Sequence, residues 1–165
     1  MTARTVLLVS VAAAACRSRV QDRVIALGRG AISNTEALGV ISASTASEVT
    51  DYAGKKVRAG PDHKYVLLNC RFAVSPNQVG FDDFQLVRER ATEVGQEVNL
   101  GDNRHGDYFY WTFLDPSGRP VAEPPVSTGP FAARLAFKVP SYEQGGYLSY
   151  WGLYWGPLQF EGFSR

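Results

Sequence analysis

Histidine side chains are the first candidates for chemistry, and this sequence of 165 residues has two, His63 and His105. A structural zinc site needs four Cys or His ligands and a catalytic zinc site needs three protein ligands, so the sequence predicts no metal site. The chain also lacks the Gly-x-Ser-x-Gly turn that presents a serine nucleophile in many hydrolases. We therefore expect a protein that is not an enzyme and that uses no cofactor.

Tyrosine and tryptophan side chains near the end of the chain are the strongest candidates for a binding surface. If residues 146–156 form one extended strand, period-two alternation puts Trp155 on one face and both Tyr150 and Tyr154 on the other. One face would join the core, and the other would present flat, stiff rings to a protein partner or a sugar. The candidate contact residues are Tyr150, Tyr154, Trp111 and Trp155. The alternative is that these rings only pack in the core.

The first sixteen residues have the pattern of an export signal. Arg4 precedes an apolar run over residues 6–15, and this run ends in small residues directly before Cys16. A transmembrane helix needs about 20 apolar residues, so the run is too short to be an anchor. Because the cysteine follows small residues, the segment also resembles the lipid-attachment box of bacterial lipoproteins, although Ala13 stands where that box prefers leucine.

These features predict an export segment over residues 1–16 and a tether over residues 17–36, followed by a folded domain over residues 37–165. Cys16 is the candidate lipidation site, and a lipid there would be the only attachment to a membrane. Two alternatives stay open. The chain is cleaved near Ala15 without lipidation, or residues 5–11 form a first strand that is never removed.

The strands that position the candidate side chains follow from hydrophobic alternation. Residues 64–74 place Val66, Leu68, Cys70 and Phe72 on one apolar face, which predicts a buried and unreactive Cys70 thiol. Strand patterns also cover residues 38–50, 84–90, 108–114 and 131–139, and residues 146–160 are expected to form a closing hairpin or pair of strands. A tight turn at residues 115–118 and an irregular, proline-rich connection at residues 120–130 separate them.

Seven to nine short strands with Gly and Pro turns and no long helix predict an all-β fold. The expected architecture is an immunoglobulin-like antiparallel β-sandwich. The 17 basic and 16 acidic residues are spread without a block of one sign, so we expect no nucleic-acid partner.

The order of three short motifs resembles the telokin-like, immunoglobulin-fold domain of unknown function found in bacterial and archaeal lipoproteins and secreted proteins. The motifs are KYVLLNCRFAVSPN at residues 64–77, FDDFQLV at residues 81–87 and LAFKVP at residues 135–140. The resemblance implies an extracytoplasmic location, either secreted or lipid-anchored at the cell surface, and no catalysis. It supplies no functional residues, and the stretch over residues 95–107 is longer and more polar than the family pattern.

Three functions are compatible with these observations. The first is an exported, non-catalytic interaction or structural module of the cell envelope that binds a protein partner. The second is a carbohydrate-binding module that uses the exposed Tyr and Trp rings. The third is a subunit of an extracellular or viral assembly, in which the N-terminal strand of one copy pairs with the sheet edge of the next.

Overall fold

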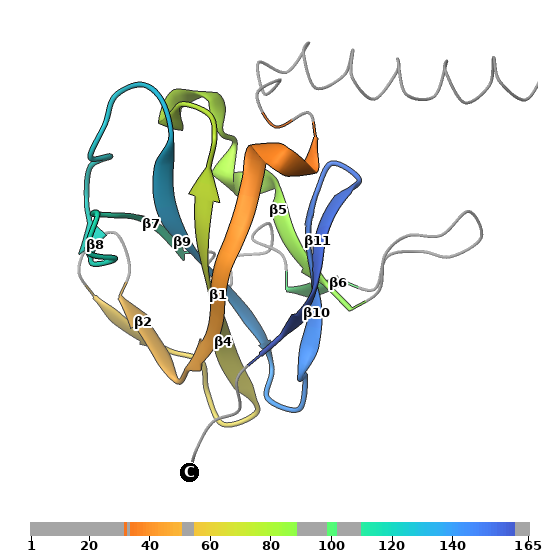
Figure 1. The fold of residues 1–165 in the computed structure, drawn as a ribbon. Coiled ribbons are helices and arrows are strands. Elements are labelled where there is room, and N and C mark those ends of the chain that lie inside the picture. The colour runs from red at the N-terminus through yellow and green to blue at the C-terminus, as the bar shows by residue number, and fades with distance from the viewer. Residues whose placement is uncertain (1–31, 33, 51–54, 89–98, 102–109, 161–165) are drawn as a thin grey trace, which may run out of the picture.

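Two antiparallel sheets pack face to face in the computed structural model, which describes residues 32, 34–50, 55–88, 99–101 and 110–160 (Figure 1). The five-stranded sheet has the order β1 (Leu38–Ala46), β4 (His63–Phe72), β9 (Phe131–Pro140), β7 (Tyr110–Leu114) and β8 (Pro120–Val121). The four-stranded sheet has the order β11 (Leu153–Gln159), β10 (Gly145–Tyr150), β5 (Phe84–Val87) and β6 (Asn99–Gly101). The predicted all-β sandwich is confirmed, with nine strands in the two sheets.

The core lies between the sheets because the two longest strands alternate as the sequence predicts. On β4 the side chains of Val66, Leu68, Cys70 and Phe72 are buried, and the paired strand β9 buries five side chains on the same face. These five are Phe131, Ala133, Leu135, Phe137 and Val139. The opposite sheet contributes side chains of β5, β10 and β11 to the same apolar cluster. Period-two alternation therefore fixes which face of each sheet is inside.

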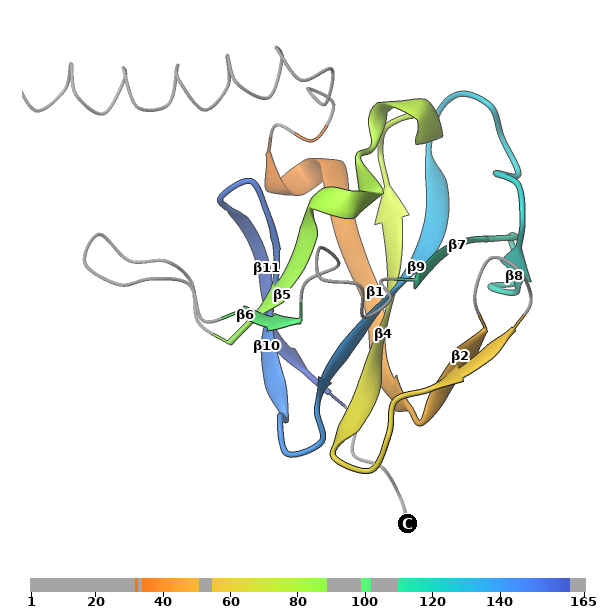
Figure 2. The ribbon, with the colours of Figure 1, turned by 180° about the vertical axis from the view of Figure 1, so that it is seen from behind.

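A small hairpin covers part of the outer face of the five-stranded sheet. It consists of β2 (Glu48–Thr50) and β3 (Lys56–Arg58), and it lies on the side away from the four-stranded sheet in both views (Figures 1 and 2). Val49 and Val57 pack against Tyr65, which is buried on the outer face of β4. The sequence did not predict this separate hairpin, since residues 38–50 look like one continuous strand.

Short 3₁₀ turns lie at one end of the core, the upper end in Figure 1, where the last two of them connect β4 of one sheet to β5 of the other. They are η1 (Thr35–Ala37), η2 (Pro76–Gln78) and η3 (Phe81–Asp83). The Asn34 side chain accepts hydrogen bonds from the backbone N–H groups of Glu36 and Ala37, as an N-cap does. Ile32, inside the predicted tether, is 1% exposed and belongs to the core.

The closing hairpin exists, but its turn changes which faces the aromatic rings occupy. Trp151 and Gly152 form a two-residue turn in which both φ angles are positive, 49° and 81°, as in the type I′ turns that join paired strands. Beyond this turn Leu148 pairs with Trp155, and Ser149 pairs with Tyr154. Tyr150 and Tyr154 therefore lie on opposite faces of the sheet, so the prediction that they share a face is wrong.

Two predicted strands are described in part. Of the strand expected over residues 84–90 the structure describes Phe84–Val87, and of that expected over residues 108–114 it describes Tyr110–Leu114, while residues 89–98 and 102–109 lie outside the described ranges. The turn over residues 115–118 is confirmed, because the Gly118 N–H donates to the Asp115 carbonyl at 2.8 Å. The predicted export segment and Cys16 lie outside the described residues. Within the described ranges, no helix has the length and apolar content to cross a membrane.

Candidate functional site

Three aromatic side chains, Trp111, Phe81 and Phe113, form a cluster at the rim of the sandwich beside η3, and we call this cluster the Trp111 ledge. Trp111 stacks on Phe81 with ring centroids 4.0 Å apart and an interplanar angle of 9°, and its other contact is edge-to-face with Phe113 at 5.0 Å. Trp111 pairs with Leu135 across β7 and β9, so it lies on the core side of its sheet. It is nevertheless 38% exposed. A ring clamped on two sides and open on part of its surface is a rigid contact point.

Two of the other predicted contact residues are part of the core. Tyr150 is 0% exposed and packs against Phe84 at 4.6 Å, and Trp155 is 8% exposed. The Trp155 indole N–H donates to the Thr35 carbonyl at 2.9 Å, which ties β11 to η1. The expectation that Tyr150 and Trp155 form an exposed contact surface is therefore wrong, because the two-residue turn directs both side chains inward.

Tyr154 lies on the outer face of the four-stranded sheet and is half-buried, opposite Ser149 of β10. It is not adjacent to the Trp111 ledge in the strand order, because β7 and β11 belong to different sheets. The four predicted contact residues are thus distributed over the core, one outer face and one rim, and do not form one surface.

Cys70 is a free thiol in the centre of the core, as predicted. Burial raises its pKa far above the ordinary value because the apolar surroundings disfavour the charged thiolate. The thiolate is the reactive form of cysteine, so Cys70 is not a nucleophile in the folded protein.

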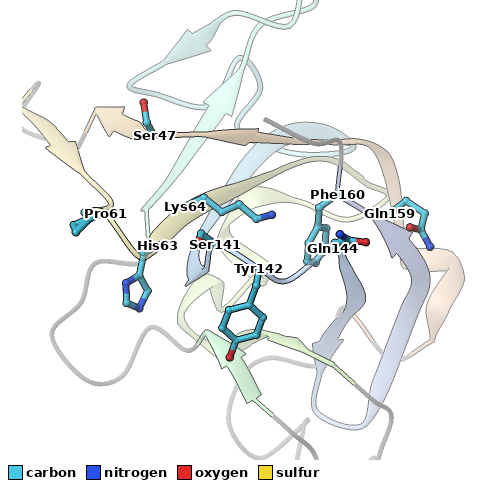
Figure 3. Close-up of a pocket in the computed structure, with 10 residues that line it drawn as sticks. Ser47, Pro61, His63, Lys64, Ser141, Tyr142, Gln144, Gln159 and Phe160 are labelled. Atoms are coloured by element: carbon cyan, nitrogen blue, oxygen red, sulfur yellow. The ribbon is translucent and has the colours of Figure 1, made fainter. Parts of the chain in front are cut away.

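A pocket of about 710 Å³ opens at the other end of the sandwich (Figure 3). Its walls come from the β1–β2 corner, the turn before β4, the turn between β9 and β10, and the end of β11. The lining residues are Ser47, Gly60, Pro61, His63, Lys64, Ser141, Tyr142, Gln144, Gln159 and Phe160. In Figure 1 the turns that carry them lie at the lower end of the view, away from η2 and η3.

Three backbone hydrogen bonds hold these separate turns together. The Ser141 N–H donates to the Asp62 carbonyl at 2.9 Å, and the Phe160 N–H donates to the Gln144 carbonyl at 2.8 Å. The Ala59 N–H donates to the Ser47 carbonyl at 2.8 Å. The pocket is therefore framed by main-chain contacts between segments that are distant in sequence.

Lys64 is the one lining residue that is both charged and buried. It is 8% exposed, and it lies on the inner face of β4, two residues before Val66 and opposite Val139 of β9. In the view of Figure 3 its ammonium end points toward Phe160 and Gln144. Among the residues that the structure describes, none accepts a hydrogen bond from Lys64 or forms an ion pair with it.

The acidic side chain next to the pocket lining, Glu143, already has a cationic partner. Glu143 lies in the turn that lines the pocket, but its own carboxylate is buried and forms an ion pair with Arg88 at the end of β5. This pairing raises the pKa of Arg88, chiefly through the hydrogen bond to Glu143. No Asp or Glu is among the ten described lining residues, and Lys64 supplies a positive charge.

The described residues include no group of three or more His, Cys, Asp and Glu side chains that could hold a metal ion. His63 is exposed at the mouth of the pocket. His105 and the remainder of the polar stretch over residues 102–109 lie outside the described residues.

Lys64 is a functional candidate that the sequence did not predict, although its pattern contains the signal. The alternation of Val66, Leu68, Cys70 and Phe72 extends back by one step to Lys64. A lysine at the first position of an apolar face was interpreted as the beginning of the strand, and its burial depends on turns that are not local to it.

Comparison with known proteins finds no matching family model, no matching curated protein and no matching solved structure.

Proposed function

We propose that this chain is an exported, non-catalytic interaction module of the cell envelope with an immunoglobulin-like fold, and that it binds a protein partner through the Trp111 ledge. The observation that carries the proposal is the stacking of Trp111 on buried Phe81 while 38% of the Trp111 side chain stays exposed. Tryptophan is enriched among the residues that dominate binding energy at protein interfaces. A clamped ring also loses little conformational freedom on binding, which favours affinity.

The strand order supports the immunoglobulin-like part of the proposal. If β2, β3, β6 and β8 are treated as additions, seven strands remain and can be lettered A to G in chain order. The order β1-β4-β9-β7 then reads A-B-E-D, and β11-β10-β5 reads G-F-C. This is the arrangement of a constant-type immunoglobulin sandwich. The chain departs from antibody domains at the inter-sheet disulfide, because β10 has no cysteine to pair with Cys70.

The export part of the proposal is supported by the sequence pattern of residues 1–16 alone. The intact mass of the protein from its native host tests it directly. A chain that starts at Cys16 with added acyl mass is a lipoprotein, and one that starts near Cys16 without it is secreted. A retained Met1 contradicts export by cleavage.

Site-specific photo-crosslinking in the native host tests the Trp111 ledge. A photoreactive phenylalanine analogue replaces Trp111 in one strain, and in the control strain it replaces Arg71, which is exposed on the outer face of β4. We expect a defined adduct at position 111 that is absent at position 71. The purified partner should then bind the wild-type protein at least tenfold more tightly than Trp111→Ala. Equal adducts at both positions, or unchanged affinity of Trp111→Ala, would contradict the proposal.

A carbohydrate-binding module is the second candidate, and the partial exposure of the Trp111 ring is the observation that favours it. Sugar rings stack on such faces. A panel of neutral oligosaccharides separates the two functions, because a carbohydrate-binding module should bind one of them and lose the binding in Trp111→Ala. If the adduct at position 111 is a second copy of this chain, the protein is an assembly subunit instead.

A further inference from the structure

We propose that the pocket at the Lys64 end of the sandwich binds the carboxylate of an acidic sugar, with Lys64 as the counter-ion. This site is independent of the Trp111 ledge, which contributes no residue to the pocket lining. The inference rests on the charge, burial and surroundings of Lys64, and on the chemistry of the other lining side chains.

The Lys64 side chain is mostly buried, and its ammonium group faces the pocket (Figure 3). Its stem extends between the sheets in line with Val66 and Val139, and the residue is 8% exposed. Lysine is rarely buried to this degree, and a lysine with a buried stem usually keeps its charged end in water. A buried charge is stabilised by an opposite charge or by hydrogen bonds, and the described part of the chain offers Lys64 neither. A bound anion would supply the missing partner.

The pocket around this charge has the size and polarity of a small-molecule site. Its volume of about 710 Å³ falls in the range of about 300 to 1,000 Å³ that is typical of ligand pockets. Its lining includes neutral hydrogen-bonding side chains and no carboxylate of the described residues. Because Glu143 is paired with Arg88, this adjacent acid does not compete for the lysine.

The uncharged side chains favour a sugar acid over a simple anion. Ser47, Ser141, Gln144 and Gln159 present hydroxyl and amide groups, which both donate and accept hydrogen bonds and so suit sugar hydroxyls. Tyr142 lies at the same site, as Figure 3 shows, and its exposed ring can contact the apolar face of a sugar ring. One cation, several neutral polar groups and one exposed ring match a uronic acid, which combines a carboxylate, hydroxyls and a ring.

Titration of the ¹⁵N-labelled protein followed by NMR tests this assignment, with sodium glucuronate, glucose, sodium acetate and inorganic phosphate as separate probes. We expect glucuronate to shift the amide signals of Lys64 and Gln144. Glucose lacks the carboxylate and acetate lacks the hydroxyls, so each should bind at least tenfold more weakly. Equal affinities for glucose and glucuronate would show that Lys64 does not bind the carboxylate. Acetate or phosphate that binds as tightly as glucuronate would overturn the sugar assignment, and no binding by any probe would overturn the site.

Lys64→Met and Lys138→Met form a matched pair of variants for the same titration. Both remove one positive charge from the five-stranded sheet, but Lys138 lies opposite Tyr65 on the outer face of β9 and is not a lining residue. Glucuronate affinity should fall at least tenfold in Lys64→Met and stay unchanged in Lys138→Met. Glucuronate should also raise the melting temperature of the wild type but not that of Lys64→Met. Equal effects of the two substitutions would show that only net charge matters and would overturn the proposal.

Discussion

The inner face of β4 has an aromatic residue buried at one end and a charged residue buried at the other. At one end of the inner face of β4, Phe72 is surrounded by aromatic rings. It stacks on Phe131 at 4.7 Å and meets Phe81 and Phe84 edge-on at 5.8 and 6.0 Å. At the other end, eight residues away, the same face carries Lys64 and a pocket. At ~3.3 Å per residue the two ends are roughly 26 Å apart.

This difference in side chains separates an end of the sandwich that contributes apolar packing from an end that contains a polar pocket. Aromatic rings fill the space between the sheets at the Phe72 end, and each contact there is between apolar groups that gain by leaving water. At the Lys64 end the sheets are closed by turns instead, and most of the side chains between these turns are polar. A core that ended in another apolar residue would be more stable, but it would leave no charge in the pocket.

Phe72→Ala tests the aromatic end and has the largest expected effect. Removing a fully buried ring leaves a cavity among Phe81, Phe84 and Phe131, so we expect the free energy of unfolding to fall by about 3 to 5 kcal/mol. Chemical denaturation followed by tryptophan fluorescence measures it. Arg71→Ala, at the exposed position next to it, should change the free energy by less than about 0.5 kcal/mol. A comparable loss in both variants would mean that the cluster is not the anchor of this end.

Lys64→Met tests the pocket end, and it should raise the free energy of unfolding, whereas Phe72→Ala should lower it. Methionine keeps the apolar stem in place and removes the cost of an unpaired charge, so without ligand we expect a gain of about 1 kcal/mol in the free energy of unfolding. For a domain of this size this gain corresponds to a rise of roughly 2 to 4 °C in melting temperature. Thermal unfolding in the absence of anions measures it. A loss of stability would show that the charge of Lys64 supports the fold itself.

The contrast between the two ends also explains which features the sequence could predict. Alternation along β4 and β9 predicts the buried face, including Cys70, because each side chain needs only the local period of two. The turn at Asp115 is likewise local, since Pro116 and Gly118 suit it. These signals determine the sandwich and its core without any knowledge of distant contacts.

The site depends on contacts that no local pattern encodes. The turn at Trp151 and Gly152 lacks the Asn-Gly or Asp-Gly pair that marks most two-residue hairpins, so residues 146–156 look like one strand and Tyr150 was predicted to be exposed. The pocket around Lys64 forms only where turns at residues 47, 60–61 and 141–144 meet the end of β11. The sequence could not predict that Lys64 is buried, because its burial depends on turns that are distant in the sequence and meet only in the folded protein.

Asp115 contrasts with Lys64, because it is a half-buried charge with several partners. One carboxylate oxygen accepts hydrogen bonds from the Ser117 hydroxyl at 2.6 Å and from the Ser117 and Arg119 N–H groups at 2.8 and 3.0 Å. The other accepts from the Arg119 guanidinium at 3.3 Å. The hydroxyl of Ser117, followed by the Arg119 N–H, lowers the pKa of Asp115 from 3.8 to about 2. These side-chain bonds are strongest while the carboxylate is ionised, whereas the backbone bond from the Gly118 N–H to the Asp115 carbonyl does not depend on that charge.

Asp115→Asn should therefore have the smallest and most pH-dependent effect. Because the folded-state pKa of Asp115 lies below its unfolded value, the carboxylate stabilises the protein above about pH 4, and this stabilisation is lost as the pH falls toward 2. The difference in unfolding free energy between wild type and Asp115→Asn should shrink over that interval. NMR titration of the Asp115 carboxyl carbon gives the pKa directly, and Ser117→Ala should move it back toward 3.8. An ordinary pKa in the wild type would show that these hydrogen bonds do not persist in solution, and the contrast with Lys64 would then rest on burial alone.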